Sequence, residues 1–275
     1  MSVGMTPSPS TLVTVLWRVI DLSLEVQWVG VDTSPHPVVV FLHEGLGSVS
    51  AWRSFPHDFC TAHGLRGLVY SRYGYGRSTP KPVGELWGLG TMQAQAQEVL
   101  PALLNTLGIT RPFLFGHSDG GSIALLYAAR FPAAGLVVMA PHNFVEDVAL
   151  RQIAVARVAY ETTGLRERLA RHHTDVDSAF RGWNDMWLNP EFKAWNIEAE
   201  LHAITCPLLA VQGEDDEYGT LEQIHRIAAR VPQTQTLVLA HCAHLPHRDQ
   251  AMALTEVAGA FIKTANSGVT AVVAD

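Results

Sequence analysis

The sequence predicts an α/β fold built on one mostly parallel, doubly wound sheet, with a helical insertion after its sixth strand. Short apolar runs rich in Val, Leu and Phe alternate with helical patterns from about residue 36 to the end. Such runs suit strands buried on both faces, and their alternation with helices implies parallel βαβ crossovers. Between residues 141 and 203 the alternation stops and the pattern is helical throughout.

The first expected element is an antiparallel hairpin at the edge of the sheet, because residues 14–31 alternate polar and apolar side chains. Six buried strands should follow, at residues 37–42, 67–70, 112–115, 135–139, 207–211 and 236–239. Helices of the same core are expected at residues 91–107, 122–130 and 249–265.

The insertion, residues 141–203, shows helical patterns at residues 147–160, 165–172 and 176–187. It also carries three of the seven tryptophans, Trp183, Trp187 and Trp195. We expect it to form a helical lid on a core made of residues 1–140 and 204–275. Neither an internal repeat nor a low-complexity linker divides the chain further.

Composition narrows the possible partners. The chain has 275 residues, 48% hydrophobic and 16% charged, with a net charge of −7. That hydrophobic share suits a large buried core and argues against disorder. Because no stretch concentrates Lys or Arg, nucleic-acid binding is not expected. A small neutral or lightly charged molecule is the expected partner, and the sequence does not indicate an oligomeric state.

The cysteines and the N-terminus point to the cytoplasm. The chain has three widely spaced cysteines, Cys60, Cys206 and Cys242. An odd number at such spacing favours reduced thiols over a disulfide framework. The apolar residues near 12–20 are interrupted by Thr14 and Arg18 and are too few to span a bilayer. We therefore expect no signal peptide and no membrane anchor.

The strongest chemical signal is a G-x-S-x-G pattern formed by Gly116, Ser118 and Gly120. An apolar strand precedes it and an Ala/Leu-rich helix follows it. In that setting the serine sits on a sharp strand-to-helix turn, and the glycines remove side chains that would clash. The pattern predicts Ser118 as a nucleophile.

A serine nucleophile needs a base, and the base needs an acid that orients it. In folds that place the serine on such a turn, the three residues follow one another along the chain as Ser, then Asp or Glu, then His. The acid and the histidine lie in loops after late strands. The sequence has an acidic loop after the strand at 207–211 and a histidine-rich loop after the strand at 236–239. The acid candidates are Glu214, Asp215, Asp216 and Glu217, with Asp147 as a remote alternative.

The base is one of His241, His244 and His247. Their spacing of three, together with Cys242, is also a possible metal cluster. However, Pro246 disfavours a continuous helix there, and the sequence shows no second ligand pair at a metal-like spacing. We expect neither a metal nor another cofactor.

These motifs resemble the α/β-hydrolase superfamily, in the capped branch of small esterases, lactonases and C–C bond hydrolases. The matching segments are residues 43–48 (HEGLGS), 71–78 (SRYGYGRS), 116–121 (GHSDGG), 212–219 (QGEDDEYG) and 241–250 (HCAHLPHRDQ). The resemblance implies Asp216 as the acid, three residues after a glycine, and His244 as the base. Ala243 stands where the family usually has glycine before that histidine.

The resemblance also implies two backbone N–H donors for an oxyanion, those of Asp119 and Gly45. The family's oxyanion loop usually begins His-Gly, whereas here Glu44 follows His43. A carboxylate pointing inward would oppose an oxyanion. We therefore expect Glu44 to face away, to hydrogen-bond the loop and to have no catalytic role.

The function expected from these residues is hydrolysis of a small to medium carboxylic ester or lactone through an acyl-enzyme. Two alternatives stay open: a C–C bond hydrolase acting on a ring-fission diketone, and a non-catalytic small-molecule receptor on the same fold. A serine at the nucleophile position argues against the epoxide hydrolase and haloalkane dehalogenase branches, which use a carboxylate. The candidate pocket residues are His142, Asn143, Trp183, Asp185 and Trp187.

Overall fold

One eight-stranded sheet forms the centre of the described chain, in the order β1-β2-β4-β3-β5-β6-β7-β8. The computed structural model describes residues 8–82 and 88–270. Residues 1–7, part of the segment for which no signal peptide is expected, lie outside these ranges. The strands are β1 (Thr11–Trp17), β2 (Ile20–Gly30), β3 (Val39–Leu42), β4 (Arg66–Tyr70), β5 (Phe113–His117), β6 (Gly135–Met139), β7 (Leu208–Gly213) and β8 (Thr234–Leu239).

Helices join most of these strands. The longer ones are α1 (Phe55–His63), α3 (Leu100–Thr106), α4 (Asp119–Ala128), α5 (Asp147–Thr162), α7 (Val176–Trp187), α9 (Glu222–Arg230) and α11 (Ala251–Thr270). The shorter ones are η1 (Ser50–Trp52), α2 (Thr91–Ala94), η2 (Gln95–Val99), α6 (Leu165–Leu169), η3 (Pro190–Ala194), α8 (Glu198–Leu201) and α10 (Pro246–Asp249).

The hairpin β1–β2 is antiparallel and continues antiparallel onto β4, while the strands from β3 to β8 pair in parallel. The prediction of a mostly parallel α/β sheet is therefore confirmed. Strand β8 begins two residues earlier than expected because Thr234 and Gln235 pair with β7 without adding to the apolar run.

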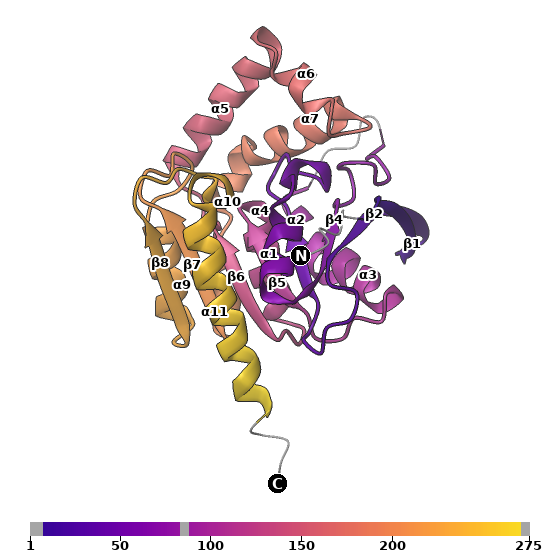
Figure 1. Cartoon of the computed structure of the whole chain (residues 1–275). Coiled ribbons are helices and arrows are strands. Elements are labelled where there is room, and N and C mark those ends of the chain that lie inside the picture. Colours follow the sequence, from indigo (N-terminus) through magenta and orange to yellow (C-terminus); the bar gives the residue numbers. More distant parts are fainter. Residues whose placement is uncertain (1–7, 83–87, 271–275) are drawn as a thin grey trace.

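Each face of the sheet is covered by helices, because neighbouring residues of a strand point to opposite sides. Val39 and Phe41 of β3 pack with α1 and α11, whereas Val40 and Leu42 pack with α3 and α4. Helix α4 runs through the core and every one of its residues is buried. This double covering is the doubly wound arrangement (Figure 1).

The insertion forms α5, α6, α7, η3 and α8 between β6 and β7. Its helices α5, α6 and α7 project beyond one end of the sheet (Figure 1). Helix α7 has the predicted bounds, whereas the expected helix at 91–107 is divided into α2, the π-helical η2 and α3.

The parallel strands place the chemistry-bearing loops together. Because parallel strands end at the same edge of a sheet, the segments after β3, β5, β6, β7 and β8 meet there. Ser118 directly follows β5, and the loops with Asp216 and His244 follow β7 and β8. The three cysteines are free thiols, and all are buried.

Candidate functional site

Ser118 occupies a strained turn between β5 and α4. Its backbone angles are φ 53° and ψ −119°, outside the regions that L-residues usually adopt. The turn needs small neighbours: a Cβ at Gly116 would lie 2.3 Å from the carbonyl oxygen of Gly120, and one at Gly120 would lie 2.0 Å from that of Leu42. The flanking glycines therefore allow the turn that presents the serine.

His244 connects Ser118 to Asp216. Nε2 of His244 lies 3.0 Å from Oγ of Ser118, and its Nδ1 lies 2.9 Å from Oδ1 of Asp216. Since a carboxylate only accepts hydrogen bonds, Nδ1 carries the proton and Nε2 presents its lone pair to the serine hydroxyl. The arrangement is that of a nucleophile, a base and an orienting acid.

The Asp216 carboxylate is itself fixed. It accepts hydrogen bonds from the side chain of Gln212 at 2.6 Å and from the backbone N–H groups of Tyr218 and Gly219 at 2.8 and 3.3 Å. These donors leave the carboxylate little freedom to turn away from the imidazole of His244.

Burial lowers the pKa of His244, but the hydrogen bond that its Nδ1 donates to Asp216 and the negative charges of Asp216 and Glu217 outweigh this effect. The net result is a pKa raised above the ordinary value for histidine. The imidazole is thus placed among groups that stabilise its protonated form, which a general base passes through.

The other acid candidates take different positions. Glu214 and Asp215 are exposed in the loop after β7, and Asp147 forms a surface ion pair with Lys193. Glu217 approaches the main chain of His244 instead of its ring, accepting a hydrogen bond from the backbone N–H at 3.2 Å. Of the acids considered, the structure brings only Asp216 against the imidazole within the described residues.

The two other histidines of the loop do not face Ser118. His241 is exposed, and His247 is buried against Trp52, with ring centroids 4.9 Å apart. In the ranges that the structure describes, no group of three His, Cys, Asp or Glu side chains has a geometry suited to a metal ion.

Gly45 and Asp119 line the same cavity as Ser118. Across the described part of the chain, neither backbone N–H has a hydrogen-bond acceptor. Asp119 begins α4, where the first N–H groups lack intrahelical acceptors. Within the described residues, both N–H groups are therefore unpaired and can serve as donors to a ligand in this cavity.

The cavity at Ser118 has a volume of about 240 Å³ and is walled by the insertion on one side. Ile153 of α5 and Trp183 and Trp187 of α7 contribute that wall. The lining residues are Glu44, Gly45, Leu46, Ser118, Asp119, His142, Ile153, Trp183, Trp187, Glu217, Tyr218, His244 and Leu245.

Of the expected pocket residues, His142, Trp183 and Trp187 line this cavity, and Asn143 and Asp185 do not. The Asn143 side chain is buried and donates to the carbonyl oxygen of Gln223 at 2.7 Å. Asp185 points to solvent and pairs with Arg157 at 2.5 Å. The placement of these two polar side chains in the pocket was wrong, because each has a partner elsewhere.

His142 is a neutral imidazole in the cavity wall. Burial, with a smaller effect of His244, lowers its pKa to about 3. Its ring packs against Trp187, with centroids 4.9 Å apart. The indole Nε1 of Trp187 donates in turn to Asp119 at 3.2 Å, so α7 is held to the start of α4.

The expectation that Glu44 faces away was also wrong. Glu44 lines the cavity, and its side chain is 27% exposed. Its neighbour His43 explains the loop geometry: Nδ1 of His43 donates to the carbonyl oxygen of Glu44 at 2.7 Å, and Nε2 accepts from the backbone N–H of Arg72 at 3.0 Å. These bonds join the loop after β3 to the loop after β4 and leave the Glu44 side chain on the cavity side.

Gly45 lies directly under α7. A Cβ added there would lie 2.1 Å from Nε1 of Trp183. Glycine at this position therefore lets the insertion approach the loop that carries the candidate oxyanion donor.

Tyr218 is a cavity residue that the sequence interpretation missed. Its ring lies 4.7 Å from that of His244, centroid to centroid. It belongs to the acidic loop after β7. Its position two residues after the expected acid, Asp216, could have indicated that it lies near the site.

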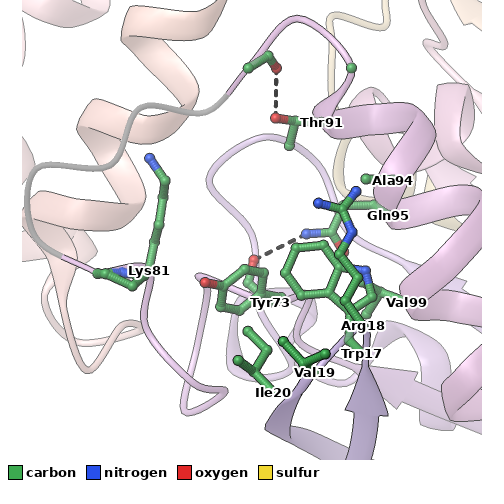
Figure 2. Close-up of a pocket in the computed structure, with 13 residues that line it drawn as sticks. Trp17, Arg18, Val19, Ile20, Tyr73, Lys81, Thr91, Ala94, Gln95 and Val99 are labelled. Atoms are coloured by element: carbon green, nitrogen blue, oxygen red, sulfur yellow. Dashed lines mark hydrogen bonds between the residues drawn. The ribbon is translucent and has the colours of Figure 1, made fainter.

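A second cavity, of about 590 Å³, lies beside the turn between β1 and β2 and the start of α2. Figure 2 shows Trp17 and Tyr73 in its wall, with Gln95 donating to the carbonyl oxygen of Tyr73 at 3.2 Å. The described residues that line it include no Ser, His, Cys, Asp or Glu. Its described lining has no serine–histidine–carboxylate arrangement, whereas the smaller cavity at Ser118 has one, so the Ser118 cavity is the candidate functional site.

The sheet order, the strained serine turn and the Ser118–His244–Asp216 contacts define the α/β-hydrolase class. Comparison with known proteins agrees: the profile described as "Alpha/beta hydrolase family" matches residues 39–257. The chain belongs to this family.

Individual relatives are distant. A 2-hydroxy-6-oxo-6-phenylhexa-2,4-dienoate hydrolase from Burkholderia cepacia is 24% identical over 244 residues, covering 78% of this chain and 83% of the relative. The enol-lactonase of Burkholderia xenovorans LB400 has a TM-score of 0.70 and 21% identity, covering 88% of this chain and 97% of its own. A thermophilic esterase from Thermogutta terrifontis has a TM-score of 0.68 and 21% identity, with coverage of 93% and 99%. Within the described residues, no helix combines the length and apolar character needed to cross a membrane.

Proposed function

We propose that this chain is a serine hydrolase that cleaves a small to medium carboxylic ester or lactone through an acyl-enzyme. The observation that carries the proposal is the continuous hydrogen-bonded line from Asp216 through His244 to Ser118, with distances of 2.9 and 3.0 Å. A cavity of about 240 Å³ at the end of this line suits a short acyl or alcohol group.

In the proposed reaction, Nε2 of His244 takes the proton of Ser118 as Oγ attacks the ester carbonyl carbon. The backbone N–H groups of Gly45 and Asp119 bind the oxyanion. The imidazolium, held by Asp216, then protonates the leaving alcohol as the carbonyl re-forms, which leaves an acyl-serine. Water repeats the same steps and releases the acid.

The insertion is part of the proposal. We infer that residues 141–203 act as a cap over Ser118, on a core of residues 1–140 and 204–275. Trp183 of α7 supports this inference through its contact position above Gly45. The three unpaired, buried thiols are consistent with the reducing conditions of the cytoplasm, where we place the protein.

A C–C bond hydrolase is the second candidate, because several relatives are named as hydrolases of 2-hydroxy-6-oxo dienoates. A dienoate carries a carboxylate, and proteins usually bind that group with Arg or Lys. The described lining of the Ser118 cavity contains neither and includes the acidic residue Glu217. The charge of the cavity therefore favours the ester or lactone.

The test is Ser118→Ala assayed with p-nitrophenyl butyrate, beside fluorophosphonate labelling of the parent protein. We expect label on Ser118 and a loss of nearly all turnover in the variant, with residual catalysis of about 10³ over water from the oxyanion donors. A parent protein without turnover would favour the receptor alternative. Faster turnover of a dienoate diketone than of short esters would favour C–C cleavage.

A further inference from the structure

His117, the residue before the candidate nucleophile, contacts the main chain of His244. Its side chain is fully buried, and its Nε2 lies 2.7 Å from the carbonyl oxygen of His244. Because a carbonyl oxygen only accepts, Nε2 must carry a proton. The main chain of His244 is thus held on both sides of its Cα, since its N–H donates to Glu217 at 3.2 Å.

The other nitrogen of His117 is an acceptor. Burial holds the pKa of His117 well below its usual range, so the ring is neutral and Nδ1 has a lone pair. Among the described residues this buried Nδ1 has no hydrogen-bond partner. The carboxyl oxygen Oε2 of Glu44 lies 3.9 Å away, and a shift of about 1 Å would bring the two atoms into hydrogen-bonding range.

An ionised Glu44 would only accept hydrogen bonds and so could not bond to the lone pair on Nδ1 of His117. A protonated Glu44 can donate a hydrogen bond to that nitrogen. We propose that Glu44 and His117 form a positioning pair for His244, in which the Glu44 carboxylic acid donates to Nδ1 of His117 and His117 holds the carbonyl oxygen of His244. The inference rests on the proposed function, because it assigns His244 the role of base.

The surroundings support this protonation state. Burial raises the pKa of the Glu44 carboxyl. This effect is larger than the lowering of the pKa by the backbone N–H of Glu44 and by nearby positive groups. Four neighbouring elements place titratable or charged groups around Glu44. These groups are Arg72 and Tyr75 from the loop after β4, His117 from the end of β5, His244 from the loop after β8, and Arg248 from α10. A protonated Glu44 also removes a negative charge from the loop that carries the oxyanion donor Gly45.

Packing fixes the His117 ring in this role. It lies against His247, with centroids 5.1 Å apart, and against Trp52 at 6.3 Å. A phenylalanine at position 117 would keep these contacts and lose the donor, whereas a glutamine would keep a donor and lose part of the packing. The two substitutions therefore separate positioning from packing.

The experiment compares His117→Phe with His117→Gln. For His117→Phe we expect kcat with p-nitrophenyl butyrate to fall tenfold to a hundredfold (about the effect of one lost buried hydrogen bond) with KM nearly constant. His117→Gln should recover most of that loss. The ¹H NMR signal of the proton between His244 and Asp216 should shift in His117→Phe and much less in His117→Gln.

The NMR signal requires no turnover, so it tests positioning even if the parent protein does not cleave esters. Equal kcat and an unshifted signal in a folded His117→Phe would overturn the role of His117. If that variant does not fold, parent-like spectra for His117→Gln support the role, and a shifted signal in the folded His117→Gln protein contradicts it.

Glu44 is tested by Glu44→Gln against Glu44→Met. The amide keeps a donor that does not ionise, so we expect Glu44→Gln to be several-fold more active than Glu44→Met and to lose less activity than the parent protein as pH rises. If the two variants are equal at every pH, the donor role of Glu44 is wrong.

Discussion

Which nitrogen of His244 carries the proton decides what the imidazole can do at Ser118. The carboxylate of Asp216 keeps that proton on Nδ1, at 2.9 Å. An asparagine there would present an N–H₂ group in some orientations, and the imidazole would then turn its proton towards the serine. In the proposed mechanism, Asp216 therefore selects a tautomer as well as supplying charge.

This role predicts the ranking of two neighbouring variants. Asp216→Asn should lower kcat by about 10⁴ by favouring the wrong tautomer. Asp215→Asn is the matched control, since Asp215 is exposed, whereas the carboxylate of the neighbouring Asp216 lies 2.9 Å from Nδ1 of His244. Steady-state kinetics with circular dichroism would check both. A larger loss in Asp215→Asn would assign the acid to position 215.

The pH profile of the base is the second prediction for a single residue. Glu217 helps to raise the pKa of His244, and the base works only in its neutral form. Activity therefore falls as pH drops through that pKa. Glu217→Gln removes one negative charge and keeps an acceptor for the His244 N–H, so the acid limb of kcat/KM should move to lower pH.

Glu214→Gln is the control for this shift, because Glu214 is exposed in the same loop. A profile that moves equally in both variants would show a general effect of net charge. An unmoved profile in Glu217→Gln would mean that its charge does not reach the imidazole.

Among the elements, α7 has the clearest consequence for substrate choice. Trp183 lines the Ser118 cavity and is nearly buried, whereas Trp195 lies in the same insertion and packs on Phe192 outside it, with centroids 5.4 Å apart. Trp183→Ala should enlarge the cavity and raise kcat/KM for longer acyl chains relative to butyrate by about tenfold.

Trp195→Ala is the control within the insertion. Removing a buried tryptophan leaves a void, and such losses cost about 3–5 kcal/mol, so its melting temperature should fall while the substrate ranking stays unchanged. Kinetics over p-nitrophenyl esters of increasing length, with thermal unfolding, would check both. A Trp183→Ala variant that only loses stability would assign Trp183 to the core.

The elements were largely predictable because periodicity reports burial. The buried strands and α7 show their pattern directly in the chain, and α7 has the predicted bounds. The π-helical η2 was not predictable, since its hydrogen-bond register leaves no mark in the apolar spacing. Likewise, chain order indicated the loops of the acid and the base, and the family resemblance selected Asp216 and His244 within them. The directions of Glu44, Asn143 and Asp185 could not be predicted because they depend on partners distant in sequence.

At the scale of the whole molecule, charge should discriminate between substrates. The net charge is −7, and the described lining of the Ser118 cavity includes Glu217 and contains neither Lys nor Arg. Anionic substrates are repelled both at a distance and in the cavity. We expect kcat/KM for p-nitrophenyl pentanoate to exceed that for the similarly sized p-nitrophenyl hemiglutarate by at least about tenfold.

Added salt should reduce the difference in kcat/KM between the two esters, because it screens the long-range repulsion between the protein and the anionic ester. The Ser118→Ala protein supplies the blank for spontaneous hydrolysis of the hemiglutarate. Faster turnover of the anionic ester would point to a cation that binds its carboxylate and would weaken the choice of a neutral substrate.

Because all three cysteines are buried, the reactivity of their thiols should report unfolding of the core. Burial raises the pKa of Cys206 to about 11 and, with nearby carboxylates, that of Cys242 to about 12, so the reactive thiolate is scarce in the native state. Burial likewise raises the pKa of Cys60. These thiols lie in the two hydrophobic clusters of the core, so a thiol-reactive dye can reach them only when those clusters open. The rate of dye incorporation then reports how often each side of the sheet is exposed.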